Sequence, residues 1–257
     1  MWARVVLGGI SVLLACSGVV RADQVRVRLL EGNARGFLVL RSLDGNVIAE
    51  GELRQKPVGA AVESRLILKF MDGSFREEAT TFSQKEVFRL ESYRLVQRGP
   101  SFPRTEISFD RKSGRYQALT QEKKGGEKTA TGPLDMPTDL YNGMALVLLK
   151  NLPASGPTSG QLAAFLPEPR LMKMVLGPEG EDPVVAGGEA QKAIRYLVKL
   201  EIGGVAGAVA TLIGKDPPDL RYWFVAGDVP AFVRFEGAMF LNGPVWRLEQ
   251  TPVEWPK

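Results

Sequence analysis

The stretch "SRLILKFMDGSFREEATTF", residues 64–82, places an apolar segment on either side of a short turn. Leu66, Leu68 and Phe70 occupy every second position, which puts them on one face of an extended strand. The dipeptide Asp72-Gly73 is typical of a tight hairpin turn, and residues 75–82 then return. The stretch therefore predicts a β-hairpin with one buried face.

The same pattern continues in both directions along the chain. Turn sequences recur at Asp44-Gly45-Asn46, Lys112-Ser113-Gly114 and Asn242-Gly243-Pro244, and residues 194–202 alternate between apolar and polar side chains. We expect a mainly β fold, an antiparallel meander that forms a partly open barrel of roughly a dozen strands. Residues 23–257 are predicted to form a single β-barrel-like domain, because we find neither an internal repeat nor a long linker.

One segment, "DMPTDLYNGMALVLLKNLP" at residues 135–153, favours a helix instead. We expect it to span residues 138–151, capped by Thr138 or Asp135, and to be apolar on nearly every side. A helix of this length reaches about 20 Å, too short for a bilayer core of about 30 Å, so no transmembrane span is predicted in the mature chain. Gly143 suggests close packing or a bend. The helix is either a fixed plug or a mobile lid over a lipid-binding cavity.

Several predicted strands are apolar on consecutive residues, so both of their faces need cover. The candidate ligand-binding residues combine this helix with C-terminal aromatic residues, and the alternative is that all of them are ordinary core. The set consists of Leu140, Tyr141, Met144, Leu148, Trp223, Phe232 and Phe235.

The N-terminus has the features of a secretory signal peptide at residues 1–22. Arg4 is followed by an apolar stretch, and small residues precede a cleavage site after Ala22. We therefore predict a periplasmic protein. The alternative is a membrane-anchored lipoprotein, because residues 13–16 approximate a lipobox that ends in Cys16.

The composition excludes many chemistries. The chain has no histidine and Cys16 is its only cysteine, which removes His-dependent hydrolysis, ordinary zinc sites and His-ligated haem. Glu77 and Glu78 are neighbours on one strand, so they should point to opposite faces. The acidic residues in the predicted surface loop 177–188 favour a solvated loop over a calcium site. We predict no catalytic residues, no metal and no cofactor.

The charge of the chain is nearly balanced. The full sequence carries +4, and two of its 33 basic residues leave with the signal peptide, so the mature chain carries +2. This balance argues against a nucleic-acid partner.

The strands, the segment "PTDLYNGMALVLLKNL" (residues 137–152) and the ending "DVPAFVRFEG" (228–237) with "GPVWRLE" (243–249) resemble an uncharacterised periplasmic β-barrel domain of Gram-negative bacteria. That domain is distantly similar to the LolA and LolB lipoprotein carriers, open barrels closed by helices over an apolar cavity. The resemblance implies structural motifs and brings no catalytic residues.

Three functions follow as hypotheses. The leading one is a non-enzymatic envelope protein that binds a lipid or other apolar ligand in a cavity capped by helix 138–151. The second is an assembly protein of the cell envelope with a solid core and a protein partner. The third is a carboxylate-based hydrolase, which needs two carboxylates that face each other.

Overall fold

The computed structural model describes residues 24–121, 125–152, 156–165, 168–186, 188–201 and 219–251. The predicted signal peptide and Cys16 lie outside these ranges. The elements, in chain order, are β1 (Ala34–Arg41), β2 (Val47–Val58), β3 (Ala61–Phe70), β4 (Phe75–Gln84), β5 (Phe88–Arg98), β6 (Thr105–Asp110), β7 (Arg115–Gln121), β8 (Glu127–Pro133), α1 (Ala145–Asn151), β9 (Thr158–Phe165), β10 (Pro169–Ala186), β11 (Glu189–Glu201), β12 (Leu220–Val225), β13 (Ala231–Ala238) and β14 (Val245–Thr251).

All fourteen of these strands belong to one antiparallel sheet. Its order is β8-β7-β6-β5-β4-β3-β2-β1-β14-β13-β12-β11-β10-β9, so chain neighbours pair except β8 and β9, which are the two edge strands, and the first strand, β1, pairs with the last, β14. The hairpin at residues 64–82 is confirmed, with Leu68 opposite Arg76. The sheet ends at β8 and β9 and is not closed. The predicted meander and partly open barrel are therefore confirmed.

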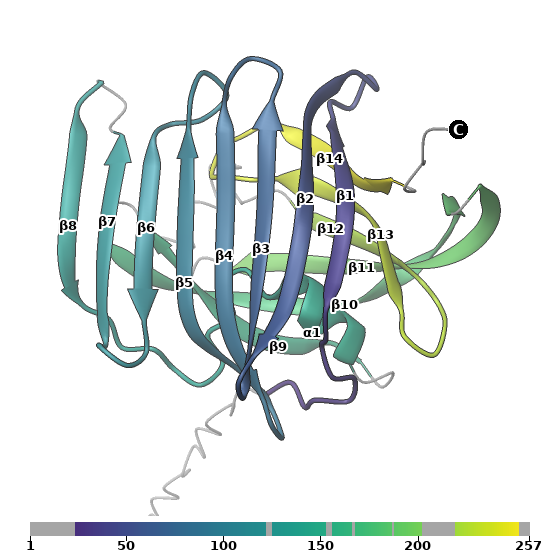
Figure 1. Ribbon diagram of the computed structural model, residues 1–257, viewed down its shortest axis with the longest axis horizontal. Coiled ribbons are helices and arrows are strands. Elements are labelled where there is room, and N and C mark those ends of the chain that lie inside the picture. Colours follow the sequence, from purple (N-terminus) through teal and green to yellow (C-terminus); the bar gives the residue numbers. More distant parts are fainter. Residues whose placement is uncertain are drawn as a thin grey trace, which may run out of the picture.

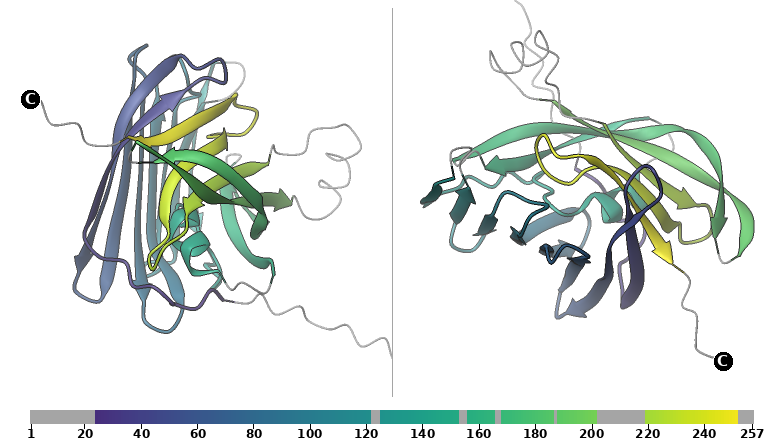
Figure 2. Two further views of the ribbon diagram at one scale, coloured as in Figure 1. Left: turned by 90° about the vertical axis from the view of Figure 1, so that its right-hand side faces the viewer. Right: turned by 90° about the horizontal axis from the view of Figure 1, so that it is seen from above.

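The sheet curls so that one part of it packs over another, and its two edge strands, β8 and β9, do not pair with each other. In Figure 1, strands β1–β8 form an upright wall, β10 and β11 cross behind it, and α1 lies between the two layers. Figure 2 shows the same layers from the side and from above. On β9, the ring of Phe165 stacks on Phe109 of β6 at 5.8 Å and contacts Tyr116 of β7 at 5.5 Å. Strand β9 thus lies against the inner face of β6 and β7.

One predicted loop is largely a strand in the structure. Residues 177–188, predicted as a surface loop, belong largely to β10 and the start of its turn into β11. The alternating strand β11 supplies a ladder of partners, and a register shift between Pro178 and Gly180 accommodates the proline. Residues 127–133, for which no element is predicted from the sequence, form β8 and pair with β7.

The predicted helix 138–151 is wrong in its first half. The helix begins only at Ala145, with Met144 as an N-cap that lacks a side-chain hydrogen bond, so neither Thr138 nor Asp135 caps it. Residues 139–142 instead run beside β9. The amide of Tyr141 donates to the carbonyl of Gln161 at 2.8 Å, and the amide of Gln161 donates to the carbonyl of Asp139 at 2.8 Å.

Residues 139–142 are extended and not helical because they lie at the open edge of β9, whose backbone N–H and C=O groups need hydrogen-bond partners. The side chain of Asn142 adds two more bonds there: its Oδ1 accepts from the amide of Ala163 at 2.8 Å, and its Nδ2 donates to the carbonyl of Ala163 at 2.9 Å. Gly143, at φ +71°, then turns the chain into the helix. We call residues 134–152 the strap.

Candidate functional site between two apolar clusters

The strap contributes four of the predicted ligand-binding residues to the interior. Leu140, Met144 and Leu148 are fully buried and Tyr141 is 2% exposed, and all four belong to the larger of two interior apolar clusters. This cluster includes Phe82, Phe88 and Leu90 from the wall of β4 and β5. The structure therefore brings these four residues together, and their role in binding a ligand stays a prediction.

Hydrogen bonds join the strap, mainly at its C-terminal end, to the segment that precedes β1. Oδ1 of Asn151 accepts from the amides of Arg28 and Leu29 at 2.8 and 2.7 Å. Lys150 forms an ion pair with the buried carboxylate of Glu31 at 2.6 Å. The hydroxyl of Tyr141 accepts from the amide of Val25 at 3.2 Å. These contacts hold the strap against the segment before β1.

The predicted aromatic residues divide between the two faces of the sheet. Phe232 and Phe235 face the interior, where Phe235 belongs to the second cluster. Trp223 does not lie with them, since its strand neighbours Tyr222 and Phe224 point inward and it points outward. The expectation that Trp223 shares an internal site with Phe232 and Phe235 is therefore wrong.

The second interior cluster is built from β1–β3, β13, β14 and the loop after β5. Its rings include Phe70, Phe102, Phe235 and Trp246, and Phe70 meets Phe102 edge-on at 5.0 Å. Three side chains on β12 and β13 are only partly buried and pack against both clusters: Leu220, Tyr222 and Phe232. They mark the zone where the two clusters meet.

The opposite wall supplies matching side chains to this zone. Leu53 on β2 and Leu66 on β3 are register partners, and both are partly buried against the second cluster. Glu78 on β4 is the next residue along the same row, opposite Leu66. The row therefore places one carboxylate among apolar side chains.

Glu78 belongs to a polar network that spans β4 and β5. Nη2 of Arg76 approaches Oε2 of Glu78 at 3.3 Å, and the hydroxyl of Tyr93 donates to Oε1 of Glu78 at 2.7 Å. Nη1 of Arg76 donates to Gln97 at 2.6 Å and to the carbonyl of Met239 at 3.2 Å. The Arg76 and Glu78 side chains are only 8% and 19% exposed, so each compensates the burial cost of the other.

Two tyrosines beside this network stay protonated. Burial, with a smaller contribution from the charge of Glu78, raises the pKa of Tyr93 well above its ordinary value. Burial also raises the pKa of Tyr222, and the Glu78 carboxylate adds to the shift. The zone thus offers neutral hydroxyls, one guanidinium and one carboxylate beside apolar side chains.

Glu77 and Glu78 do not form the facing pair of carboxylates that glycoside hydrolysis requires. Glu77 and Glu78 point to opposite faces, as predicted, because Glu77 accepts from Arg65 and Arg94 outside while Glu78 accepts from Arg76 and Tyr93 inside. Within the described residues, no three acidic or cysteine side chains gather where they could hold a metal ion. Among the same residues, no helix is long and apolar enough to cross a bilayer.

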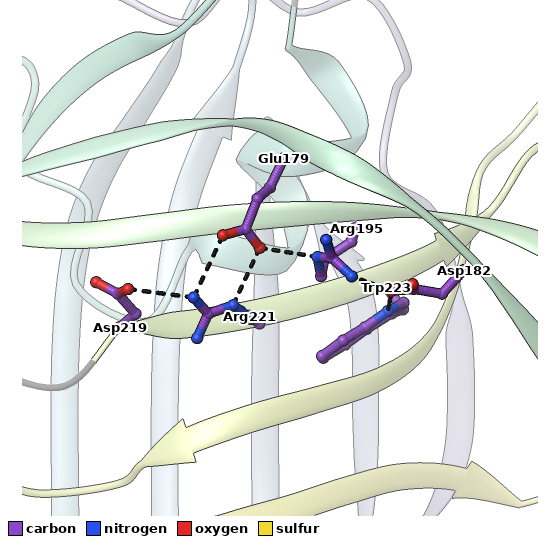
Figure 3. Close-up of polar contacts among 6 residues, drawn as sticks. All are labelled: Glu179, Asp182, Arg195, Asp219, Arg221 and Trp223. Carbon is purple, nitrogen blue, oxygen red and sulfur yellow. Dashed lines mark hydrogen bonds and ion pairs between the residues drawn. The ribbon is translucent and has the colours of Figure 1, made fainter.

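A second polar cluster lies on the outer face of β10–β12 (Figure 3). Arg221 donates to both carboxylate oxygens of Glu179, at 3.0 and 3.2 Å. Arg195 donates to Glu179 at 2.8 Å and to Asp182 at 2.5 Å. The indole of Trp223 donates to Asp182 at 2.7 Å. Arg221 also contacts Asp219 at 3.2 Å.

This outer cluster holds both acids in the charged form. The bond from Arg221 lowers the pKa of Glu179, and the bond from Trp223 lowers the pKa of Asp182. A general acid would need a raised pKa, so the two acids are suited to ion pairing instead. Trp223 packs here with Val184 and Ala193, and fastens the β10–β11 hairpin to β12.

The sequence did not nominate the polar network or the partly buried residues of the opposite wall. Leu53, Leu66, Arg76 and Glu78 look like ordinary strand residues. The signal that could have indicated the network is the alternation of side chains along β4, which puts Arg76 and Glu78 on one face. The register of the 64–82 hairpin then places Glu78 opposite Leu66. Their position opposite β12 and β13 depends on the curl of the whole sheet.

No family model matches this chain, and no curated protein matches it. Among solved structures, the chain is similar to a crystal structure described as a beta-barrel-like protein of the domain of unknown function DUF1849 from Brucella abortus. The two share 8% sequence identity with a TM-score of 0.47, over 86% of this chain and 99% of that one.

Proposed function

We propose that this protein is a non-enzymatic protein of the cell envelope that binds a lipid or other apolar ligand in the interior of its barrel-like sheet. The observation that carries the proposal is the zone between the two clusters. Partly buried apolar side chains meet there from opposite walls, Leu53 and Leu66 on one side and Leu220, Tyr222 and Phe232 on the other.

The polar network suits a ligand with one polar end. An amphipathic molecule would lay its apolar part against these side chains and direct its polar end to the Arg76, Glu78 and Tyr93 network. The strap, which contains Leu140, Met144 and Leu148, then forms the lower wall of the site. The predicted signal peptide and the resemblance to LolA and LolB support an envelope location and a carrier-like role.

One observation favours the alternative of an assembly protein with a solid core. The strap residues are completely buried and tied to the segment before β1, so the lower end of the interior is filled. The two functions differ in whether the zone around Phe232 takes up a molecule.

The test is native mass spectrometry of the protein after expression with its own N-terminal segment in a bacterial periplasm. We expect co-purified lipid, or uptake of an added fatty acid, by the wild type. Phe232→Glu places a charge on the apolar wall and should reduce uptake at least about tenfold. Leu66→Trp should reduce it by filling the same zone with apolar volume.

Val185→Glu is the control, because Val185 is 76% exposed on the β10–β11 hairpin. Circular dichroism verifies that each variant is folded. A wild-type protein that neither carries nor takes up lipid would refute the binding function and favour the assembly role.

A further inference from the structure

The two edges of the sheet differ in how far they are covered. The strap covers the edge of β9, where residues 139–142 form hydrogen bonds with Gln161 and Ala163. Strand β8 forms the opposite edge, and Figure 1 shows it at the left end of the wall. Within the described residues, no strand other than β7 pairs with β8. An uncovered edge presents backbone groups that can pair with another strand.

The ladder between β7 and β8 shows which backbone groups face this free edge. The amide of Leu134 donates to the carbonyl of Gly114 at 2.8 Å, which continues the register of the two strands by one pair. Hydrogen-bonded pairs recur at every second position of an antiparallel ladder, so the even-numbered residues of β8 bond to β7. The odd-numbered residues of β8 therefore direct their N–H and C=O groups away from β7.

Thr129 and Thr131 lie in the middle of the free edge. Both are exposed, and each directs one N–H and one C=O outward. Pro133 offers only a carbonyl, and the two charged residues of the strand, Glu127 and Lys128, lie together at its other end. The edge is therefore charged at one end only and is free of charged side chains from Thr129 onward.

We propose that β8 pairs antiparallel with β8 of a second copy of this chain, around a two-fold axis at Ala130. Only positions whose backbone groups face outward in both copies can form hydrogen-bonded pairs across such an interface. An axis at Ala130 meets this condition, because it matches Thr129 with Thr131 of the partner subunit and Thr131 with Thr129 of the partner subunit. Each hydrogen-bonded pair exchanges two N–H···O=C bonds, and facing threonine side chains stabilise paired strands further.

The charges of β8 suit this antiparallel register. Glu127 faces Pro133 of the partner subunit. Lys128 faces Gly132 of the partner subunit, so no like charges lie opposite each other. A parallel pairing in register would instead place each charged residue beside its own copy. The charge pattern of the strand is thus complementary to itself in the antiparallel direction.

The apolar inner face of the sheet continues across the proposed interface. Ala130 is partly buried and packs against the larger interior cluster. On the axis, its methyl group meets that of Ala130 of the partner subunit on the same face, because residues directly opposite in an antiparallel pair share a face. The pairing therefore covers the free backbone groups of both copies and adds an apolar contact at its centre.

Sedimentation velocity with the full chain, between about 1 µM and 1 mM, tests the proposal. A single strand pair buries little surface, so we expect a weak dimer with a Kd on the order of 100 µM. Thr131→Pro removes an outward N–H that β7 does not use, so it should weaken the dimer at least about tenfold and preserve the fold. Thr131→Val is the matched control, because it keeps that N–H, and should dimerise as the wild type does.

Cysteine pairing tests the register. Cys16 is the only native cysteine, so Ala130→Cys and Thr129→Cys are each introduced into a chain that carries Cys16→Ser. The two copies of Ala130 form a non-hydrogen-bonded pair with Cα atoms about 4.5 Å apart, within the range of a disulfide. We expect Ala130→Cys to give a disulfide-linked dimer on a non-reducing gel. Thr129→Cys should not, because its two copies lie diagonally, beyond about 7 Å.

Thermal melting verifies that the variants are folded, and the cysteine pair decides the question if Thr131→Pro does not fold. A wild-type chain that stays monomeric at about 1 mM would overturn the proposal. So would a dimer that folded Thr131→Pro leaves unchanged, or a disulfide that forms equally at both positions. Phe232→Glu, in the interior, should dimerise as the wild type does, which separates this interface from the interior site.

Discussion

Gly143 is the residue on which the path of the strap depends. Its φ of +71° is rarely adopted by other residues, and a Cβ there would lie 2.2 Å from Oγ1 of Thr80 and 3.2 Å from the ring of Tyr93. Gly143→Ala should therefore lower the free energy of unfolding by about 2–4 kcal/mol, measured by urea denaturation.

Gly45 provides the comparison for this prediction. It has a φ of +93° in the exposed turn before β2, and a Cβ there would meet nothing within 4 Å. Gly45→Ala should lower the free energy of unfolding by only about 1 kcal/mol, from the backbone conformation alone. Equal effects of the two substitutions would show that the contact with Thr80 contributes nothing.

Asn151 joins the end of α1 to the segment before β1. Its buried Oδ1 accepts from two backbone amides, so Asn151→Ala leaves two N–H groups without that acceptor. We expect a loss of about 2–4 kcal/mol in the free energy of unfolding. Asn46→Ala, in an exposed turn, should cost less than about 1 kcal/mol. If Asn151→Ala also costs less than that, water has replaced the side chain and the strap is not fastened at this point.

At the scale of elements, the sequence predicts best where the interactions are local. The 64–82 hairpin follows from alternation and one turn dipeptide, and both lie within a few residues of each other. The start of α1 does not follow from local sequence, because residues 139–142 are hydrogen-bonded to β9, about twenty residues further along the chain. Trp223 was misplaced for a related reason, since consecutive aromatic residues show that both faces are covered but not which one faces inward.

The β10–β11 hairpin should respond to acid. The pKa values of Glu179 and Asp182 lie below their ordinary values of 4.5 and 3.8, so their ion pairs stabilise the hairpin above those values. This contribution disappears as the pH falls through the lowered values. We expect amides in β10 and β11 to lose protection from hydrogen exchange below about pH 4, before amides in β3 and β4.

Asp182→Asn tests the origin of that response. The amide keeps an acceptor for the Trp223 indole but carries no charge for Arg195, so the hairpin should be less protected at neutral pH and should change less on acidification. An unchanged acid response in this variant would assign the effect to other carboxylates.

At the scale of the whole molecule, the curl of the sheet brings together the two walls of the proposed interior site. Strand β9 packs inside β6 and β7, so β12 and β13 come to face β2 and β3 across the zone that contains Glu78. The meander follows from the turns in the sequence. The position of Leu66 opposite Phe232 cannot be predicted from the sequence in this way. It depends on how far the fourteen strands curl, which no short stretch of residues determines.

The most direct test of the interior site is an NMR experiment with a spin-labelled fatty acid and methyl-labelled protein. The account predicts selective broadening of the methyl signals of Leu53, Leu66 and Leu220, which lie in the zone between the clusters. Leu43 and Leu171, which are 57% and 42% exposed, should remain sharp. Broadening confined to these exposed leucines, or no broadening at saturating fatty acid, would contradict the claim that the interior binds an apolar ligand.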